Sequence, residues 1–161
     1  ADPHFAADFP AQAPDGSAAL QPLTVPEAES LLSRYDILLP ASVDLGTSVY
    51  RQFLQYHSAS DLLSCRDVIA ALAPDYLSAF DAVMNQTRFN GWNMFLTHYP
   101  VFRAYCDWLF PILEETEQRI HPENRTDYQQ RIMGFLGERL LQVWLLMQPL
   151  RIYDTPCYTI R

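Results

Sequence analysis

The stretch Arg131–Gln148 reads RIMGFLGERLLQVWLLMQ, and it decides the fold that we predict. Apolar residues recur along it at helical spacing. Thr126 and Gln129 have the spacing of a capping box just before it, and Pro149 ends the pattern. We therefore predict one long helix over residues 126–148.

Two glycines lie inside this predicted helix, at Gly134 and Gly137. A glycine in a helix interior destabilises the helix by about 1 kcal/mol relative to alanine. Two such residues three positions apart indicate either close approach by another backbone or a site where a ligand needs room.

The chain before this helix is also mostly helical. Its apolar spacing and capping signals predict helices over residues 24–34, 47–57, 60–73, 74–86 and 100–120. Short apolar runs predict three strands, at Ile37–Pro40, Trp92–Leu96 and Leu150–Tyr153. The fold class is therefore α/β and helix-dominated, with several amphipathic helices and a few short strands.

The first 26 residues differ in composition from the rest. They are rich in alanine and proline, and they lack the basic and apolar regions of a signal peptide. We predict a linker or long loop over residues 1–26 and a single helix-rich domain over residues 27–161. The chain does not begin with methionine, so we expect it to be part of a longer protein.

Composition excludes several classes of protein. The chain has 161 residues, of which 49% are apolar, so it can bury a core. Its formal net charge of −8 argues against nucleic-acid binding through a broad basic patch. No apolar run is long enough to predict a transmembrane segment. Three widely spaced cysteines, Cys65, Cys106 and Cys157, predict reduced thiols and a cytoplasmic location.

Common catalytic and metal-binding motifs are absent from the sequence. It has no GxSxG, no HExxH, no phosphate-binding glycine loop and no cysteine–histidine quartet. We therefore predict no cofactor in this chain. No Asp-x-Asp pair is present to place a divalent metal. Among the four histidines, His57 is the best candidate for a site, because it ends an amphipathic helix beside polar residues.

The informative residues are polar ones in apolar surroundings. Asn93 follows Trp92 in an aromatic run, where a buried amide serves either as a structural link or as a ligand-binding group. Glu138 is followed by Arg139, and Arg131 lies about two turns earlier. A sheltered carboxylate can act as a general base, or it can pair with an arginine and fix helix packing. Trp92 fits either the core or a sugar-binding face.

Several segments, taken together, are more distinctive than any one of them. They are Ile37–Pro40, Tyr50 to His57, Pro74–Leu77, Asn93–Phe95, Phe102 to Leu113 and Arg131 to Trp144. In this order, over about residues 31–154, they resemble a bacterial family of formally unknown function. That family is found in capsular and exopolysaccharide gene clusters and is commonly described as glycosyltransferase-like.

The resemblance implies transfer of a sugar from a nucleotide-sugar donor to a saccharide or lipid-linked acceptor, at the cytoplasmic face of the membrane. Family members carry an N-terminal portion with a His-Tyr-Arg-Arg-Tyr-Phe segment and most of the donor site. This chain resembles the remaining, acceptor-side half of a GT-A-like enzyme, and we expect it to be inactive alone.

The same resemblance implies roles for the candidate residues. Glu138 would be the catalytic base, and Arg139 and Arg131 would orient it or bind the diphosphate. Asn93 would hydrogen-bond a sugar hydroxyl. Trp92 and His57 would complete the substrate site.

Two other functions stay open at this point. The first is a non-catalytic helical domain for binding or assembly, whose exposed apolar surface would cause self-association. The second is an acidic module that binds a basic protein, which the even spread of acids along the chain disfavours. Whether Asn93, Glu138 and Arg139 meet in one pocket distinguishes an enzyme from the non-catalytic domain.

Overall fold

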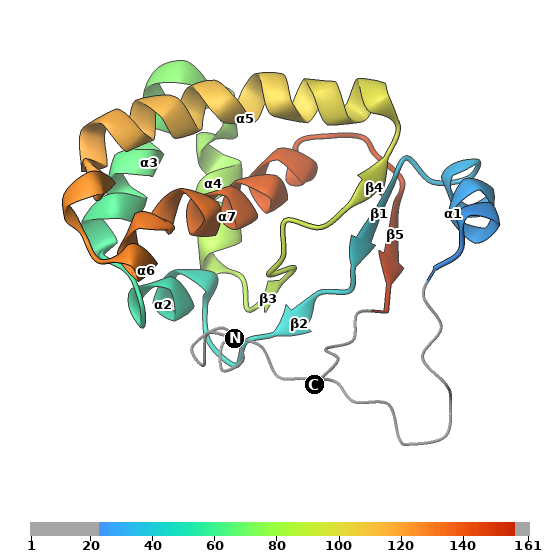
Figure 1. Cartoon of the computed structure of the whole chain (residues 1–161), viewed down its shortest axis with the longest axis horizontal. Helices are drawn as coiled ribbons and strands as arrows, with labels where there is room; N and C mark the ends of the chain where they lie inside the picture. The colour runs from blue at the N-terminus through green and yellow to red at the C-terminus, as the bar shows by residue number, and fades with distance from the viewer. Residues whose placement is uncertain (1–22, 157–161) are drawn as a thin grey trace.

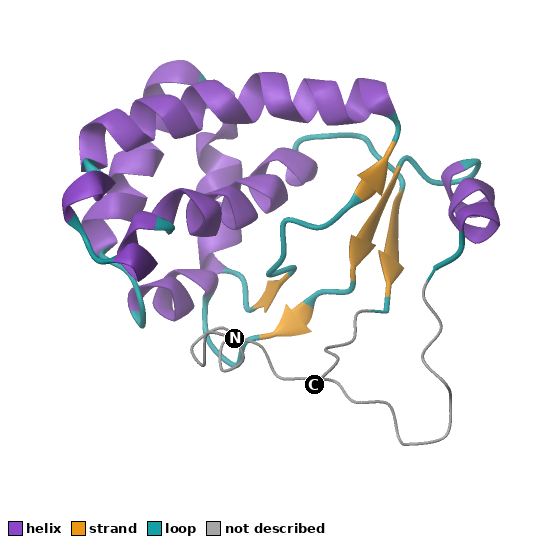
Figure 2. Cartoon of the chain, viewed as in Figure 1, coloured by secondary structure: helices purple, strands orange, loops and turns teal. Residues whose placement is uncertain are grey.

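A small sheet lies between helix α1 (Val25–Leu32) on one side and the other helices on the other (Figures 1 and 2). The computed structural model describes residues 23–156. Its α-helices are α1 (Val25–Leu32), α2 (Val49–Leu54), α3 (Ala59–Leu72), α4 (Leu77–Asn85), α5 (Tyr99–Ile120), α6 (Asp127–Gln130) and α7 (Ile132–Leu146). The 3-10 helices are η1 (Pro74–Tyr76) and η2 (Pro122–Asn124). The helix-dominated fold class that the sequence predicts is confirmed.

Strand β1 (Ile37–Pro40) is the centre of a three-stranded mixed sheet. It pairs antiparallel with β4 (Leu96–Thr97) and parallel with β5 (Ile152–Thr155). All four β1 residues are buried, which explains why this strand is apolar throughout instead of alternating. The predicted buried strand is thus confirmed. A separate antiparallel pair joins β2 (Val43–Asp44) to β3 (Arg88–Phe89).

Helix α7 runs through the helical layer and supplies much of the core. It packs against α4 and α5, and eleven of its fifteen residues are buried. A helix that is apolar on nearly every side is stable only when neighbours cover it on most sides. The stretch Arg131–Gln148, which contains α7, therefore determines where α4 and α5 pack.

Two predictions about this part of the chain are wrong. The single helix expected over residues 126–148 is divided at Arg131, where ψ is 5° and the N–H bonds to the Tyr128 carbonyl. Of the strand expected at Trp92–Leu96, only Leu96 lies in a strand, as the first residue of β4. In the loop before β4, the Asn90 and Asn93 side chains bind backbone carbonyls of other segments, so side-chain bonds replace a strand ladder.

The linker predicted over residues 1–26 stays a prediction over most of its length. Residues 1–22 lie outside the described residues, while Val25 and Pro26 already belong to α1. Thr24 and Glu27 form a capping box at the start of this helix. Cys65 and Cys106 are free thiols, and Cys157 lies outside the described residues.

Candidate functional site

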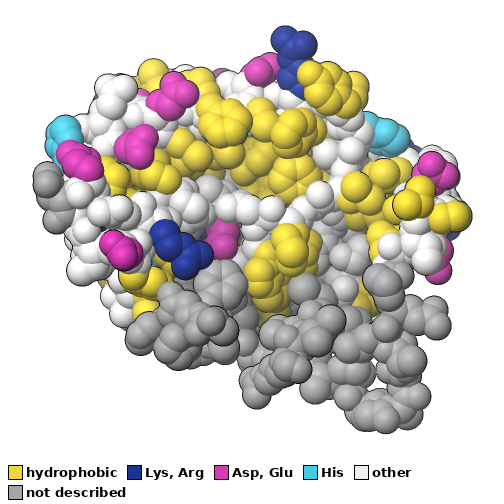
Figure 3. All heavy atoms as spheres, viewed as in Figure 1, with side chains coloured by type: hydrophobic (Ala, Val, Ile, Leu, Met, Phe, Trp, Pro, Cys, Tyr) yellow, Lys and Arg dark blue, Asp and Glu magenta, His cyan; other side chains and the backbone are white. Residues whose placement is uncertain are grey.

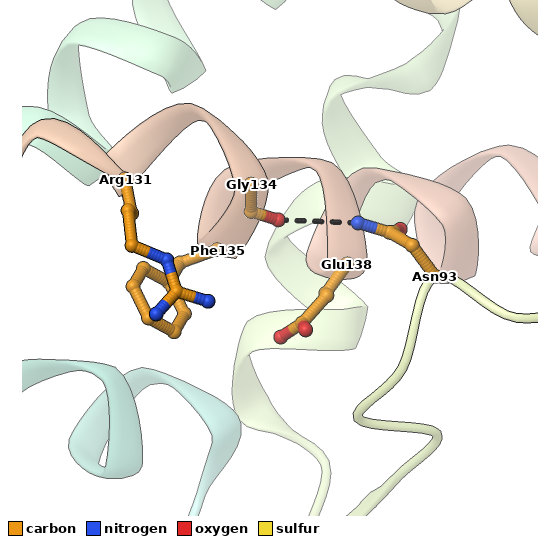
Figure 4. A pocket seen from close by; sticks show the side chains of 5 residues that line it. All are labelled: Asn93, Arg131, Gly134, Phe135 and Glu138. Carbon is orange, nitrogen blue, oxygen red and sulfur yellow. Dashed lines mark hydrogen bonds between the residues drawn. The ribbon is translucent and has the colours of Figure 1, made fainter. Parts of the chain in front are cut away.

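A hollow of about 360 Å³ lies between the first half of α7 and the loop before β4. This volume is at the lower end of the range for small-ligand sites. Its lining residues are Asn93, Arg131, Gly134, Phe135 and Glu138 (Figure 4). Four of them follow one another at i, i+3, i+4 and i+7, so they occupy one face of the helix start.

Asn93 joins the loop to α7. Its Nδ2 donates to the Gly134 carbonyl oxygen at 3.3 Å, as Figure 4 shows. A Cβ placed on Gly137 would lie 3.4 Å from this same Nδ2, whereas one on Gly134 would meet nothing within 4 Å. The close approach expected at these glycines therefore occurs at Gly137, through a side chain and not through another backbone. Gly134 leaves open space in the hollow.

Glu138 places its carboxylate at the hollow with a buried arginine behind it. The side chain of Glu138 is 12% exposed, and one of its carboxylate oxygens lies 3.4 Å from Nη1 of Arg139. Figure 4 shows its carboxylate and the Arg131 guanidinium both extending below α7 in that view. Asn93, Glu138 and Arg131, which the sequence analysis singled out, thus line one hollow.

Arg139 does not line this hollow, so Asn93, Glu138 and Arg139 do not all meet in one pocket as the enzyme hypothesis had predicted. Its Nη1 donates to the Phe135 carbonyl at 2.8 Å, and its Nη2 donates to Oε1 of Gln52 at 2.6 Å. The guanidinium carbon lies 5.0 Å from the ring centroids of both Phe53 and Phe89. The structure therefore places this cation in the core, where its Nη1 contacts the Glu138 carboxylate.

Arg131 lies at the N-terminal end of α7, on the exposed side of the hollow. Its guanidinium carbon is 5.7 Å from the Phe135 ring centroid. The hollow thus combines a cation, a carboxylate, an amide and an aromatic ring. Trp92 is partly buried and is not among the lining residues.

His57 lies on the other side of Phe135, with its ring centroid 4.3 Å from that ring. It also stacks on Tyr128, with centroids 5.7 Å apart. Burial disfavours the charged imidazole, and the nearby Arg139 charge adds to this, so the pKa of His57 is lowered to about 4. His57 is therefore neutral at pH 7 and does not line the first hollow.

A second hollow of about 210 Å³ begins at His57 and includes a tightly paired acid. Asp61 is buried and accepts two bonds from Arg125, at 2.6 Å and 2.9 Å. Ser58, the N-cap of α3, and Gln129 complete the lining. Sequence reasoning missed this pair, because its members are 64 positions apart and no motif relates them.

Sequence reasoning also gave no role to Phe135 and none to Gly134 beyond the need for room. The helical spacing of Gly134 and Phe135 relative to Arg131 and Glu138 was the signal that could have placed all four on one face. Within residues 23–156, no group of three or more histidine, cysteine or acidic side chains is arranged to hold a metal ion. No helix of that described part is both long enough and apolar enough to cross a lipid bilayer.

Comparison with known proteins identifies the family. Residues 9–149 match the family model described as "Domain of unknown function (DUF4422)". The chain belongs to this family. The membership confirms the resemblance to a family of unknown function that the sequence segments indicated. No curated protein matches the sequence of this DUF4422 chain.

The fold of the DUF4422 chain is similar to part of a solved glycosyltransferase structure. That structure is the apo form of WbbM, a bifunctional glycosyltransferase, with a TM-score of 0.73 and 23% sequence identity. The match covers 78% of this chain and 24% of the WbbM chain. At this identity the likeness shows a shared fold, and the DUF4422 chain spans about a quarter of the length of the larger protein.

Proposed function

We propose that the DUF4422 chain forms the acceptor-side part of a glycosyltransferase that acts in surface polysaccharide synthesis. The enzyme would move a sugar from a nucleotide-sugar donor to a hydroxyl of a saccharide or lipid-linked acceptor. The observation that carries this proposal is the meeting of Glu138, Asn93 and Arg131 in one hollow. The family membership and the fold shared with part of a glycosyltransferase support it.

Glu138 is the candidate base in this proposal. In an inverting transfer, the acceptor oxygen bonds to C1 of the donor sugar while the bond from C1 to the nucleoside diphosphate breaks. A carboxylate removes the proton of the attacking hydroxyl in the same step. Glu138 suits this role because its carboxylate borders the hollow and lies 3.4 Å from a buried arginine.

Other lining residues would bind the two substrates. Arg131 is placed to balance the charge of the leaving diphosphate, since guanidinium groups bind phosphate oxygens through paired N–H donors. Asn93 uses one amide N–H on Gly134, and its Oδ1 suits a sugar hydroxyl. Phe135 is buried beneath the Arg131 guanidinium, so it would contribute an apolar wall to the site.

Arg139 and His57 would act through these residues, as positioning residues. Arg139 lies too deep to touch a substrate, and its bond to Gln52 fixes the cation behind Glu138. Neutral His57 packs behind Phe135 and holds that ring in place. Trp92 does not line the hollow. Its role as a sugar-binding residue therefore stays a prediction.

Substitution of the candidate base tests the proposal in the full-length protein. We expect Glu138→Gln to lower turnover by roughly 100- to 10,000-fold, because the amide cannot accept the hydroxyl proton. Release of nucleoside diphosphate from a panel of nucleotide sugars, with candidate acceptors, measures turnover. Thermal unfolding shows whether the fold is retained.

Glu117→Gln is the matched control, because it makes the same chemical change on the exposed side of α5. It should leave turnover unchanged. Near-normal turnover of the Glu138→Gln variant would remove Glu138 from the mechanism. No transfer by the wild-type full-length protein with any donor would favour the non-catalytic assembly domain.

A further inference from the structure

Helix α5 carries a second apolar stripe beside the one that it buries. The buried stripe consists of Tyr105, Leu109, Ile112, Thr116 and Ile120. The second stripe consists of Tyr99, Phe102, Cys106, Phe110 and Leu113, whose spacing follows the helical repeat. Tyr99 is 70% exposed and Phe110 is 53% exposed. Figure 3 shows apolar side chains gathered over α5 and the segments beside it.

This second stripe has an internal symmetry. Phe102 and Phe110 lie four residues before and after Cys106, and Tyr99 and Leu113 lie seven residues before and after it. A twofold axis through Cys106 would therefore place each side chain of this stripe opposite another member of the stripe in an antiparallel copy, and Leu113 also packs against the core of its own chain. Such self-complementarity is what a twofold interface between identical chains requires.

The charges beside the stripe fit the same arrangement. Arg103 and Asp107 lie one turn apart along the edge of the stripe, and their side chains are 68% and 70% exposed. Their contact within one chain is long, at 3.6 Å. In an antiparallel copy with its axis at Cys106, Arg103 of each chain comes within one turn of Asp107 of the other. Asp107 of each chain also comes equally near to Asp107 of the other, so the two acids lie at the axis and the two Arg103 cations flank them and balance their charge.

We propose that the stripe on α5 binds a second copy of this chain, antiparallel, with the twofold axis at Cys106. Phe102 of each copy packs against Phe110 of the other, and the two Arg103–Asp107 pairs set the register. The interface does not depend on the glycosyltransferase proposal, because Glu138 and the hollow play no part in it.

The first test is the concentration dependence of mass in sedimentation equilibrium. The wild-type chain should form dimers at micromolar to millimolar concentrations. Phe110→Glu should weaken association by about 100-fold, because the dimer would bury two carboxylates without partners. Leu63→Glu is the matched control, since Leu63 is a similarly exposed apolar residue on α3, and it should leave the dimer intact.

A charge-reversal pair tests the register. R103D and D107R should each be monomeric alone, because the homodimers would place like charges opposite one another. An equimolar mixture should form heterodimers, since each R103D chain then faces a D107R chain with opposite charges at both positions. Repulsion within each chain is the same alone and in the mixture, so only an interface effect restores association.

Cross-linking tests the position of the axis. In a C157S background, a short bismaleimide should join two chains through Cys106, and C106S should abolish the product. Cys65 is buried, with its pKa raised to about 12, so it does not compete. A monomer at millimolar concentration, a dimer that Phe110→Glu leaves intact, or a mixture that stays monomeric would each overturn the proposal.

Discussion

The two hollows beside Phe135 use their acids in different ways. In the smaller one, both oxygens of Asp61 accept short bonds from Arg125, and this arginine also donates to the Ile120 carbonyl. In the larger one, Glu138 contacts Arg139 through one oxygen at 3.4 Å and borders open space. Both acids are buried, both line a hollow and both lie beside an arginine, so neither burial nor a neighbouring cation distinguishes them.

The two arginines differ in the acceptors to which their guanidinium groups donate hydrogen bonds. Arg125 bonds directly to the acid and links the start of α3 to the segment after α5. Arg139 uses its stronger bonds on Gln52 and the Phe135 carbonyl, so its contact with Glu138 is secondary. A buried ion pair is therefore weak evidence for a site unless the partners of both members are known.

Among these variants, Asp61→Asn should cause the largest loss in the free energy of unfolding. It leaves the Arg125 cation without its counter-charge in a mostly buried position, and such changes cost about 3 to 5 kcal/mol. The partial exposure of Arg125 argues for the lower end, at about 3 kcal/mol. Urea unfolding of the wild type and the variant measures the loss.

Glu138→Gln is the matched change in the other hollow. It should cost about 1 kcal/mol or less, because Arg139 keeps its bonds to Gln52 and Phe135. Equal losses for the two variants would contradict the distinction between a structural and a site carboxylate.

A smaller effect should appear in the pH dependence of stability through His57. An exposed imidazole has a pKa of 6.5, whereas the folded protein holds the pKa of His57 at about 4. As the pH falls below 6.5, the unfolded chain therefore binds the proton first, and the folded state loses stability down to about pH 4.

His57→Phe should remove this part of the pH dependence while it keeps the packing against Phe135. The free energy of unfolding, measured in urea between pH 4 and pH 7.5, shows it as a flatter curve for the variant. Parallel curves for the two proteins would mean that His57 is not held neutral by its surroundings.

The smallest expected effect is at Gly134. Gly134→Ala should raise the free energy of unfolding by about 0.5 to 1 kcal/mol, because alanine favours the helix and its Cβ meets nothing. Gly137→Ala should raise the free energy of unfolding by less, since the added Cβ would lie close to the Asn93 side chain. Urea unfolding of both variants gives the order, and a larger gain at Gly137 would contradict the close contact with Asn93.

The sequence predicted the elements with strong local signals. The buried strand at Ile37–Pro40, the first helix near Thr24 and the long helix α5 all follow from short-range patterns. Asn93 and Glu138 were selected because each is a polar residue among apolar ones, and both line the same hollow. Local chemistry was sufficient to select these two residues, but the burial expected for Asn93 is wrong, because its side chain is exposed.

The remaining features depend on contacts between distant segments. The segment Trp92–Phe95 has strand-like composition, but the Asn93 amide binds the Gly134 carbonyl. Asn90, just before the segment, binds the Pro40 carbonyl. Arg139 follows Glu138 in the sequence but points into the core, towards Gln52. The pairing of Asp61 with Arg125 also needs the folded chain. A sequence pattern contains none of these long-range partners.

The central sheet also has a consequence for the order of folding. Ile37 pairs with Ile152, so the sheet joins the two ends of the described chain. Contacts this distant in sequence close slowly, because the loop between them must first lose its freedom. We therefore expect the helices to assemble first and the β1–β5 ladder to form last. Nascent chains that still lack β5 would expose the apolar β1 strand until synthesis reaches it.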